Sequence, residues 1–242
     1  MKKLRVPSLQ HLARNWSDRP DRIAKQLVNL VEHPPTFSYE PVFDLVRDNL
    51  VFDLPLEAAI KGIEKHRCSP IAKRNFLELF PMIHAHFAKV KPSFVAEVGG
   101  RIYPIGPDLF VPFTPPLIYG VGLGLVFPWL SFWRNNPLAG ENLELFVTLV
   151  SDLLAEDPDL EQADFQILDF SIPRGSDDRQ LTLINTKEIN RVSERRKLEM
   201  LDTFVTGYRL AQVTLATKSA KVVRSKDDVS SDSLSLDLFP EL

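Results

Sequence analysis

The sequence predicts an α+β domain in which a helical N-terminal part packs on a mostly antiparallel sheet, with two further helices and a disordered C-terminal tail. Three observations lead to this fold class. Up to about residue 90, apolar residues recur every three or four positions behind Ser and Pro. From residue 94, short β-rich runs are separated by Gly, Pro and Asp. Beyond residue 217 the apolar pattern stops, which predicts a single domain over residues 1–216 (1–90 helical, 91–216 sheet plus helices) and a flexible tail over 217–242.

The composition excludes several classes of protein. The 242 residues are 44% hydrophobic and 25% charged, which is typical of a folded globular chain. Lys and Arg number 29 against 32 Asp and Glu, so the chain as a whole is not a polycation built to coat nucleic acid. The single cysteine, Cys68, excludes an internal disulfide framework and a cysteine-rich zinc module, and it fits a reducing, cytoplasmic location. Residues 1–6 have no apolar stretch behind their basic side chains, so no secretory signal is expected.

One uncharged stretch, residues 109–133, is long enough to span a bilayer. It contains Pro112, Pro115, Pro116 and Pro128. Each internal proline removes a helix hydrogen bond at ~3 kcal/mol, so a spanning helix is not expected. We interpret the stretch as a buried, β-rich part of a protein that does not enter a membrane.

Three helices are expected in the N-terminal part. The first has Pro20 in its first turn and ends before Pro34, the second follows Ser38, and the third begins at Ser69 and Pro70. Their apolar faces comprise Ile23, Leu27, Leu30 and Val31, then Val42, Leu45, Val46 and Leu50, and finally Ile71, Phe76, Leu79, Phe80, Ile83 and Phe87.

Strands and two further helices are expected after residue 93. A hairpin is expected over 94–98 and 101–105 around Gly99 and Gly100, continued by a strand over 109–113. A strand over 123–132 and a helix over 143–154 follow. A second hairpin is expected over 165–172 and 180–185, and the last helix over 193–216.

Two pairs of potential metal ligands and the serines are the candidates for a metal site and a catalytic site. His66 and Cys68 are two residues apart, as are His84 and His86, and on a helix such pairs diverge, so no metal site and no cofactor are expected. The serines form no nucleophile-elbow pattern, so no catalytic residue is assigned.

The second expected hairpin carries an acid and a lysine that could form a metal-dependent nuclease site. Asp169 lies on the first expected strand of the pair, and Asn185, Thr186 and Lys187 end the second. This layout loosely resembles the PD-(D/E)xK nucleases, in which carboxylates hold Mg²⁺ and a lysine polarises the attacking water. Asn185 stands where the second acid belongs, and a neutral amide does not supply the charge that holds the metal. An ordinary hairpin with a solvated lysine is the alternative.

Basic residues in the last part of the chain could contact a phosphate backbone. Arg191, Arg195, Arg196 and Lys197 form one group, which a charged helix face also explains. Lys218, Lys221, Arg224 and Lys226 form a second group, followed by an acidic and serine-rich segment. The second group is expected to contact DNA.

The end of the chain carries a short peptide motif. Ser235, Leu236, Asp237, Leu238 and Phe239 resemble the bacterial sliding-clamp-binding motif, usually Gln-Leu-(Ser/Asp)-Leu-Phe. Four positions fit, and Ser235 departs from the pattern because the glutamine normally anchors in a second pocket. Apolar side chains on a solvated tail favour burial in the groove of a partner. The resemblance implies that the DNA polymerase sliding clamp of a bacterium is the partner.

The sequence therefore predicts a non-enzymatic bacterial protein that docks on the sliding clamp through its tail and modulates DNA replication or repair, or inhibits growth as toxin–antitoxin proteins do. Two alternatives remain open at this point. One is a nucleic-acid enzyme of the PD-(D/E)xK kind with a degenerate metal site at Asp169 and Lys187. The other is an interaction module whose tail packs on its own domain.

Overall fold

Proline and serine set where the N-terminal helices begin. The computed structural model describes the chain over residues 4–232, and side chains up to residue 218. Within that part, the elements before the first strand are α1 (Leu9–Asn15), α2 (Pro20–Glu32), α3 (Glu40–Phe52), α4 (Leu56–Lys65) and α5 (Pro70–Phe87). Proline occupies the first turn of α2, α3 and α5. The N–H groups of a first turn have no partner within the helix, so the missing N–H of proline costs no hydrogen bond there. Ser69 caps α5, since its hydroxyl accepts a hydrogen bond from the backbone N–H of Ala72.

The three expected N-terminal helices are confirmed, with one error in the buried face of α5. Ile71 is 55% exposed, and Ala72 is buried in its place. The reason is the helical period: Ala72, Phe76 and Phe80 are four residues apart and share a face that Ile71 does not reach. Helices α1 and α4 were not predicted, because they span only 7 and 10 residues and give a short apolar pattern.

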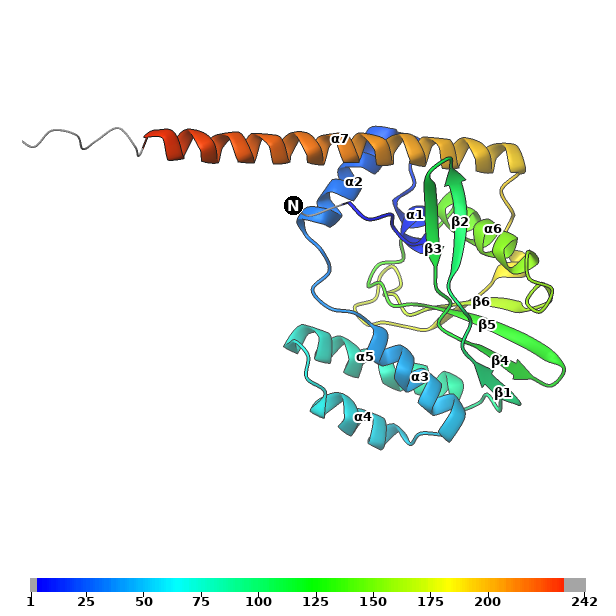
Figure 1. Ribbon diagram of the computed structural model, residues 1–242. Coiled ribbons are helices and arrows are strands. Elements are labelled where there is room, and N and C mark those ends of the chain that lie inside the picture. Colours follow the sequence, from blue (N-terminus) through cyan, green and yellow to red (C-terminus); the bar gives the residue numbers. More distant parts are fainter. Residues whose placement is uncertain (1–3, 233–242) are drawn as a thin grey trace, which may run out of the picture.

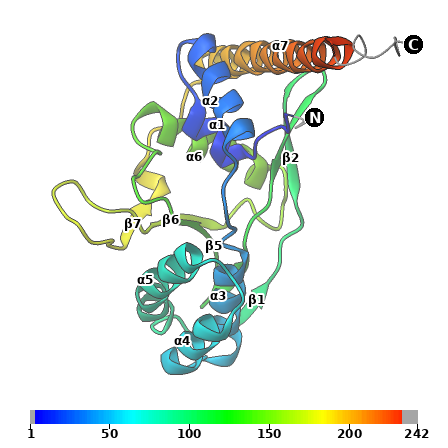
Figure 2. The same ribbon diagram turned by 90° about the vertical axis from the view of Figure 1, so that its left-hand side faces the viewer.

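The chain after α5 forms two sheets (Figures 1 and 2). The larger sheet has the order β1-β4-β5-β6-β7, with strands β1 (Phe94–Ala96), β4 (Ile118–Val121), β5 (Gly124–Ser131), β6 (Asp164–Asp169) and β7 (Thr182–Asn185). The smaller one pairs β2 (Arg101–Gly106) with β3 (Leu109–Phe113). Strands β5 and β6 are parallel and the other pairs are antiparallel. The α+β class with a mostly antiparallel sheet is therefore as the sequence predicts.

The expected hairpin around Gly99 and Gly100 is wrong. β1 pairs with β4, with Phe94 opposite Gly120, whereas β2 pairs with β3 in the separate sheet. The tight turn lies instead between β4 and β5, where Gly122 has a φ of +60° that favours glycine. The two glycines at 99 and 100 thus connect two sheets.

The later elements follow the expected order. Helix α6 (Glu141–Ala155) links β5 to β6, the β6–β7 hairpin is confirmed, and a 3₁₀ turn (Thr186–Glu188) follows β7. Helix α7 (Glu194–Asp232) begins where the last helix is expected. Its packed side ends near Ala211 and Leu215, as predicted, while its backbone continues as helix beyond the expected end at residue 216.

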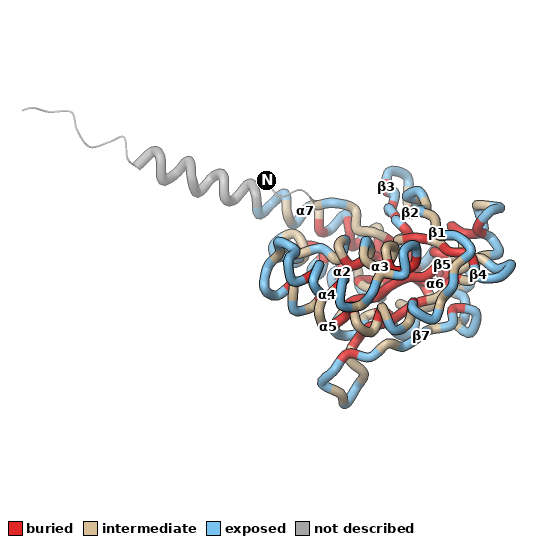
Figure 3. The backbone as a smooth tube through the Cα atoms, turned by 90° about the horizontal axis from the view of Figure 1, so that it is seen from below, coloured by how far each residue is buried: buried red, intermediate tan, exposed pale blue. Residues whose placement is uncertain are grey.

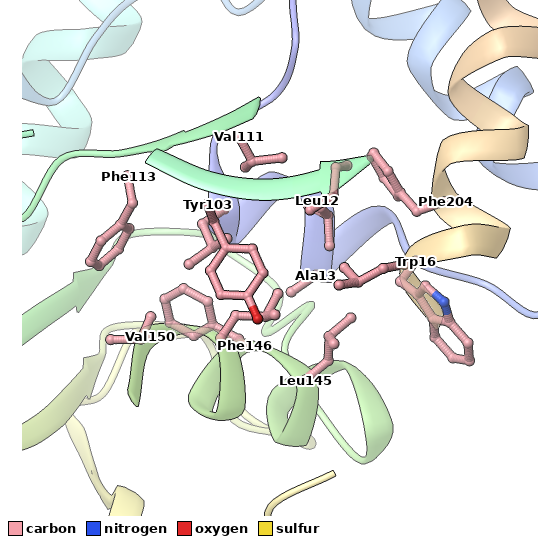
Figure 4. Close-up of a cluster of buried hydrophobic side chains, with 14 of the residues drawn as sticks. Leu12, Ala13, Trp16, Tyr103, Val111, Phe113, Leu145, Phe146, Val150 and Phe204 are labelled. Carbon is pink, nitrogen blue, oxygen red and sulfur yellow. The ribbon is translucent and has the colours of Figure 1, made fainter. Parts of the chain in front are cut away.

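Two hydrophobic clusters lie on opposite faces of the larger sheet. Phe127, Trp129, Phe165 and Ile167 belong to the first, with α1, α2, α6, α7 and the β2–β3 hairpin. Leu130, Phe132, Leu168 and Phe170 belong to the second, with α3, α4 and α5. The alternation along β5 and β6 sends successive side chains to opposite faces. Figure 3 shows the buried positions gathered along these central strands, and Figure 4 shows Leu12, Tyr103, Phe146 and Phe204 converging in the first cluster.

The uncharged stretch over residues 109–133 is β-rich, as expected: it contains β3, β4 and β5. Among the described helices, none has the length and apolar character that crossing a bilayer requires.

Candidate functional site

The predicted clamp-binding residues, Ser235, Leu236, Asp237, Leu238 and Phe239, lie outside the described residues. So do the side chains of Lys221, Arg224 and Lys226, whose backbone belongs to α7.

Lys218 is the one predicted DNA contact whose side chain the structure describes. Its Nζ lies 2.6 Å from Glu32 Oε1, at the end of α2. Both side chains are about half exposed, at 54% and 41%. Lys218 therefore ties α7 to α2, and its ammonium group already has a carboxylate partner.

Two members of the basic group, Arg196 and Lys197, pair with acids of another helix, whereas Arg195 pairs with Glu199 within α7 and Arg191 is exposed. Lys197 Nζ lies 2.6 Å from Asp152 Oδ2 and has a side chain only 9% exposed. Arg196 pairs with Glu141 at 3.2 Å and lies over the ring of Trp16. These contacts join α7 to α6 and α1, in keeping with the charged-helix-face interpretation.

The structure does not bring Asp169 and Lys187 together. Asp169 ends β6, whereas the Nζ of Lys187 pairs at 2.7 Å with Asp164, which begins the same strand. The β6–β7 register places Asn185 opposite Gln166, three residues from Asp169 and so roughly 10 Å along the strand. The nuclease-like layout is thus split between the two ends of the hairpin.

The histidines weighed as metal ligands have other roles. His84 Nε2 hydrogen-bonds the carbonyl oxygen of Leu54 at 3.0 Å, and the ring of His86 meets Phe87 edge-on. Over the described part of the chain, no three His, Cys, Asp or Glu side chains gather in a way that could hold a metal ion.

A cleft of about 510 Å³ opens at the carboxyl end of β5. Residues 129–133 line it together with α1, the start of α3 and the loop over 114–116. Its lining comes from both hydrophobic clusters, because Trp129 belongs to the first and Leu130 and Phe132 to the second. Carboxyl ends of parallel strands are a common place for ligand sites in open sheets, and β5 and β6 form the parallel pair here.

The β4–β5 ladder stops beside the cleft. The paired residues end at Tyr119 and Val126, and the same register continued would set Pro116 opposite Trp129 and Pro115 opposite Leu130. Proline has no N–H to donate, and Pro128 of β5 itself would face Leu117 in the next hydrogen-bonded pair, so the ladder does not continue. The edge of β5 beyond that point is left beside the proline loop.

The backbone of Leu130 faces this edge. Phe170 N donates to Ser131 O at 2.9 Å, so Ser131 directs its backbone groups toward β6. Neighbouring residues of a strand direct their N–H and C=O groups to opposite sides, so those of Leu130 point to the side of the prolines.

Aromatic rings form much of the wall. Tyr39 and Phe43 lie 4.9 and 5.3 Å, between ring centroids, from Phe132. His11 and Trp133, which also line the cleft, meet edge-on at 5.7 Å between ring centroids.

Polar atoms without partners surround the same cleft. Gln10, His11, Trp129 and Ser131 line it, and their atoms Oε1, Nδ1, Nε1 and Oγ are buried beneath its surface with no well-aligned hydrogen bond to any described residue. Trp129 and Ser131 are themselves only 8% and 4% exposed. A buried polar group without a partner costs roughly 1–3 kcal/mol, so four such atoms at one cleft mark a place where a ligand can supply hydrogen bonds.

Three titratable groups at or near the cleft have displaced pKa values, and burial raises that of Tyr39. Burial, and then the positive charge of Arg14, lower the pKa of His11 to about 4, so its imidazole is neutral at pH 7. Burial raises the pKa of the Asp169 carboxyl, against the opposing effect of the Ser171 and Ser131 hydroxyls. Ser171 Oγ donates to Asp169 Oδ2 at 2.8 Å, while Ser131 lies beside the carboxyl without well-aligned geometry.

A buried arginine fixes the strands that end at the cleft. The side chain of Arg179 is 2% exposed, and its Nη1 donates to the carbonyl oxygens of Phe132 and Phe170 at 3.0 and 2.9 Å. Its Nε lies 3.4 Å from Glu78 of α5. Arg179 thereby holds the ends of β5 and β6 against α5.

The charged residues of the cleft are mostly acidic. Glu40, Asp44 and Glu97 line it with a single guanidinium, that of Arg47. Arg47 is already paired with Glu97 at 2.6 Å and with Asp44 at 3.5 Å.

Comparisons with protein-family models, with curated proteins and with solved structures found no match to this chain.

The cleft is not predicted from the sequence. The one local signal for it is the proline pair after β3, which by itself argues only against a membrane helix. His11 and Arg179 gave no signal, because their partners lie more than a hundred residues away or in backbone carbonyls.

Proposed function

We propose that this chain acts in the bacterial cytoplasm by docking on the DNA polymerase sliding clamp through Ser235–Phe239, and that it modulates or inhibits DNA replication or repair from there. The observation that carries the proposal is the peptide itself, in which Leu236, Asp237, Leu238 and Phe239 fit the motif.

The course of α7 supports the proposal. Its packing against the first cluster ends at Leu215, and its helical backbone continues 17 residues further, to Asp232. At the helical rise this is about 26 Å. Figure 1 shows this part of α7 leading away from the body of the molecule. The motif follows in sequence directly after an element that points away from both clusters.

The energetics are adequate for a peptide interaction. Burying an apolar side chain in a groove contributes ~1.5–3 kcal/mol, before the cost of ordering the peptide. Leu238 and Phe239 together would contribute ~3–6 of the ~8 kcal/mol that a micromolar affinity requires, and Leu236 and the backbone of the peptide add to this.

The test is a titration of a purified bacterial sliding clamp with the full chain. The double variant Leu238→Ala with Phe239→Ala should lose measurable binding, and Ser235→Gln should tighten it by supplying the missing amide. Leu234→Ala, an apolar truncation just outside the motif, is the matched control and should bind as the wild type does. Thermal melts should be the same for all four proteins.

Each alternative has its own outcome. A large drop in the melting temperature of the double variant would favour the interaction module with a self-packed tail. Failure of every variant to bind, Ser235→Gln included, would make the motif a chance match. Mg²⁺-dependent DNA cleavage lost in Asp169→Ala would favour the nuclease.

A further inference from the structure

The cleft at the end of β5 is a built site that clamp docking does not use. It combines three features described above: aromatic walls, buried polar atoms without partners, and an acidic lining. We propose that it binds a flat aromatic heterocycle of the nucleobase kind that is uncharged or positively charged.

The walls select a planar aromatic group. Tyr39, Phe43 and Phe132 form a group of rings in the lining, and Trp133 belongs to the same lining. Stacking of a base on an aromatic side chain is worth ~1–3 kcal/mol and depends on the π-face. A volume of about 510 Å³ is within the usual range for small-molecule sites and suits a base with its sugar.

The polar atoms require a group that both donates and accepts hydrogen bonds. Trp129 Nε1 only donates, the Ser131 hydroxyl can accept while its hydrogen points to the adjacent Asp169 carboxyl, and a neutral His11 offers one donor and one acceptor. The N–H and C=O groups of Leu130 add an adjacent donor and acceptor along the free strand edge. A heterocycle with alternating ring nitrogens and exocyclic amino or carbonyl groups matches this set, whereas a hydrocarbon leaves it unsatisfied.

The charges disfavour an anion. Glu40, Asp44 and Glu97 outnumber Arg47, whose guanidinium is occupied by two of them. Arg14 lies over Trp133, at 5.1 Å from its ring centroid, outside the lining. A phosphate on the ligand would therefore meet like charge, so a nucleoside should bind better than its nucleotide.

The experiment is calorimetric titration of the full-length protein with adenosine, guanosine, cytidine and uridine, and with AMP. We expect at least one nucleoside to bind, and AMP to bind about 10-fold more weakly than adenosine if adenosine is that nucleoside. Phe43→Ala should weaken nucleoside binding about 10-fold. The matched control is Phe52→Ala, which removes the same ring from the same helix, where it is 73% exposed and outside the cleft.

Two further variants keep the test decisive. Ser131→Ala should weaken binding several-fold, and it carries the test if Phe43→Ala melts too low to titrate. Glu40→Gln should reduce the difference in affinity between adenosine and AMP. A purely structural role for Glu40 would leave that difference unchanged. The Leu238→Ala and Phe239→Ala double variant should bind nucleoside as the wild type does, since the site is separate from the tail.

The proposal is overturned if none of the four nucleosides binds at millimolar concentration. It is also overturned if AMP binds more tightly than adenosine, or if Phe43→Ala and Ser131→Ala both leave the affinity unchanged. If nucleoside binds only to the Leu238→Ala and Phe239→Ala double variant, the proposal is replaced by one in which the tail of the wild type occupies the cleft.

Discussion

Gly207 of α7 and Ile23 of α2 lie so close together that the two helices cross with no room for a side chain on the glycine. A Cβ atom on Gly207 would be 2.6 Å from Ile23 Cβ and 2.8 Å from the carbonyl oxygen of Pro20. Ile23 is fully buried, so neither helix can easily give way. Gly207 therefore sets how near α7 lies to α2.

Gly207→Ala should lower the free energy of unfolding by about 1–3 kcal/mol, because the added methyl group overpacks this crossing. Alanine is favoured over glycine inside a helix by ~1 kcal/mol, so the clash must exceed that gain. The control is Gly62→Ala in α4, where nothing lies within 4 Å of the new Cβ and the protein should become more stable. Urea unfolding measures both, and a Gly207→Ala protein as stable as Gly62→Ala would contradict the close approach.

His11 should make stability depend on pH in the acid range. Its pKa is about 4 in the folded protein against an ordinary value of 6.5, so the unfolded chain binds the proton more tightly. The free energy of unfolding should fall as the pH drops from about 6.5 to about 4, by on the order of 3 kcal/mol in all, and then lose no more from this residue. His11→Gln should flatten this slope, whereas the exposed His66→Gln should keep it. Equal slopes in all three proteins would be inconsistent with a buried, neutral His11.

Asp169 should behave in the opposite sense. Burial raises the pKa of its carboxyl, so the folded state holds the proton more tightly than the unfolded chain, and ionisation reduces stability as the pH rises through the folded pKa. Asp169→Asn should therefore raise the unfolding free energy at pH 7, and the gain should disappear at acid pH. Asp164→Asn breaks the ion pair with Lys187 instead and should lower stability by about 0.5 kcal/mol. Chemical unfolding at pH 7 that finds Asp169→Asn the less stable of the two would refute this assignment.

The cations of α7 should divide into two roles. If Lys221, Arg224 and Lys226 contact DNA, the triple alanine variant should reduce the salt dependence of binding to a DNA-loaded clamp by about 2–3 in log–log slope. Lys218→Ala alone should change that slope little, since Lys218 pairs with Glu32, and should instead cost a few tenths of a kcal/mol in stability. An unchanged slope in the triple variant would leave the peptide as the only contact.

The parts of the fold that the sequence predicts are those with a local cause. A proline in the first turn and apolar residues at helical spacing located α2, α3 and α5, and the alternating pattern located the β6–β7 hairpin. Pairing between strands that are distant in sequence has no such cause. Gly99 and Gly100 have the composition of a turn, but whether β1 turns back on β2 or pairs with β4 is decided by which faces are buried against α3 and α5.

The sequence predicts even less of the candidate site than of the fold. Asp169 was found by its place on a strand, but its distance from Lys187 depends on the hairpin register, which a pattern of residue types leaves open. The cleft gathers residues 10, 43 and 131 from three separate elements. Its unpartnered atoms belong to residues that would be ordinary core or surface positions in another arrangement.

Pro115 and Pro116 lie where the β4–β5 ladder ends, so the sheet lacks hydrogen bonds at the place where the cleft opens. Replacing both prolines, together with Pro128 of β5 itself, with residues that carry an N–H, such as Pro115→Thr, Pro116→Val and Pro128→Val, would allow β4 to extend along β5, gaining ladder hydrogen bonds and narrowing the cleft. A more complete sheet would thus leave a smaller site. The backbone at the end of the ladder thus influences the size of the cleft, whereas the lining side chains determine which ligand fits it.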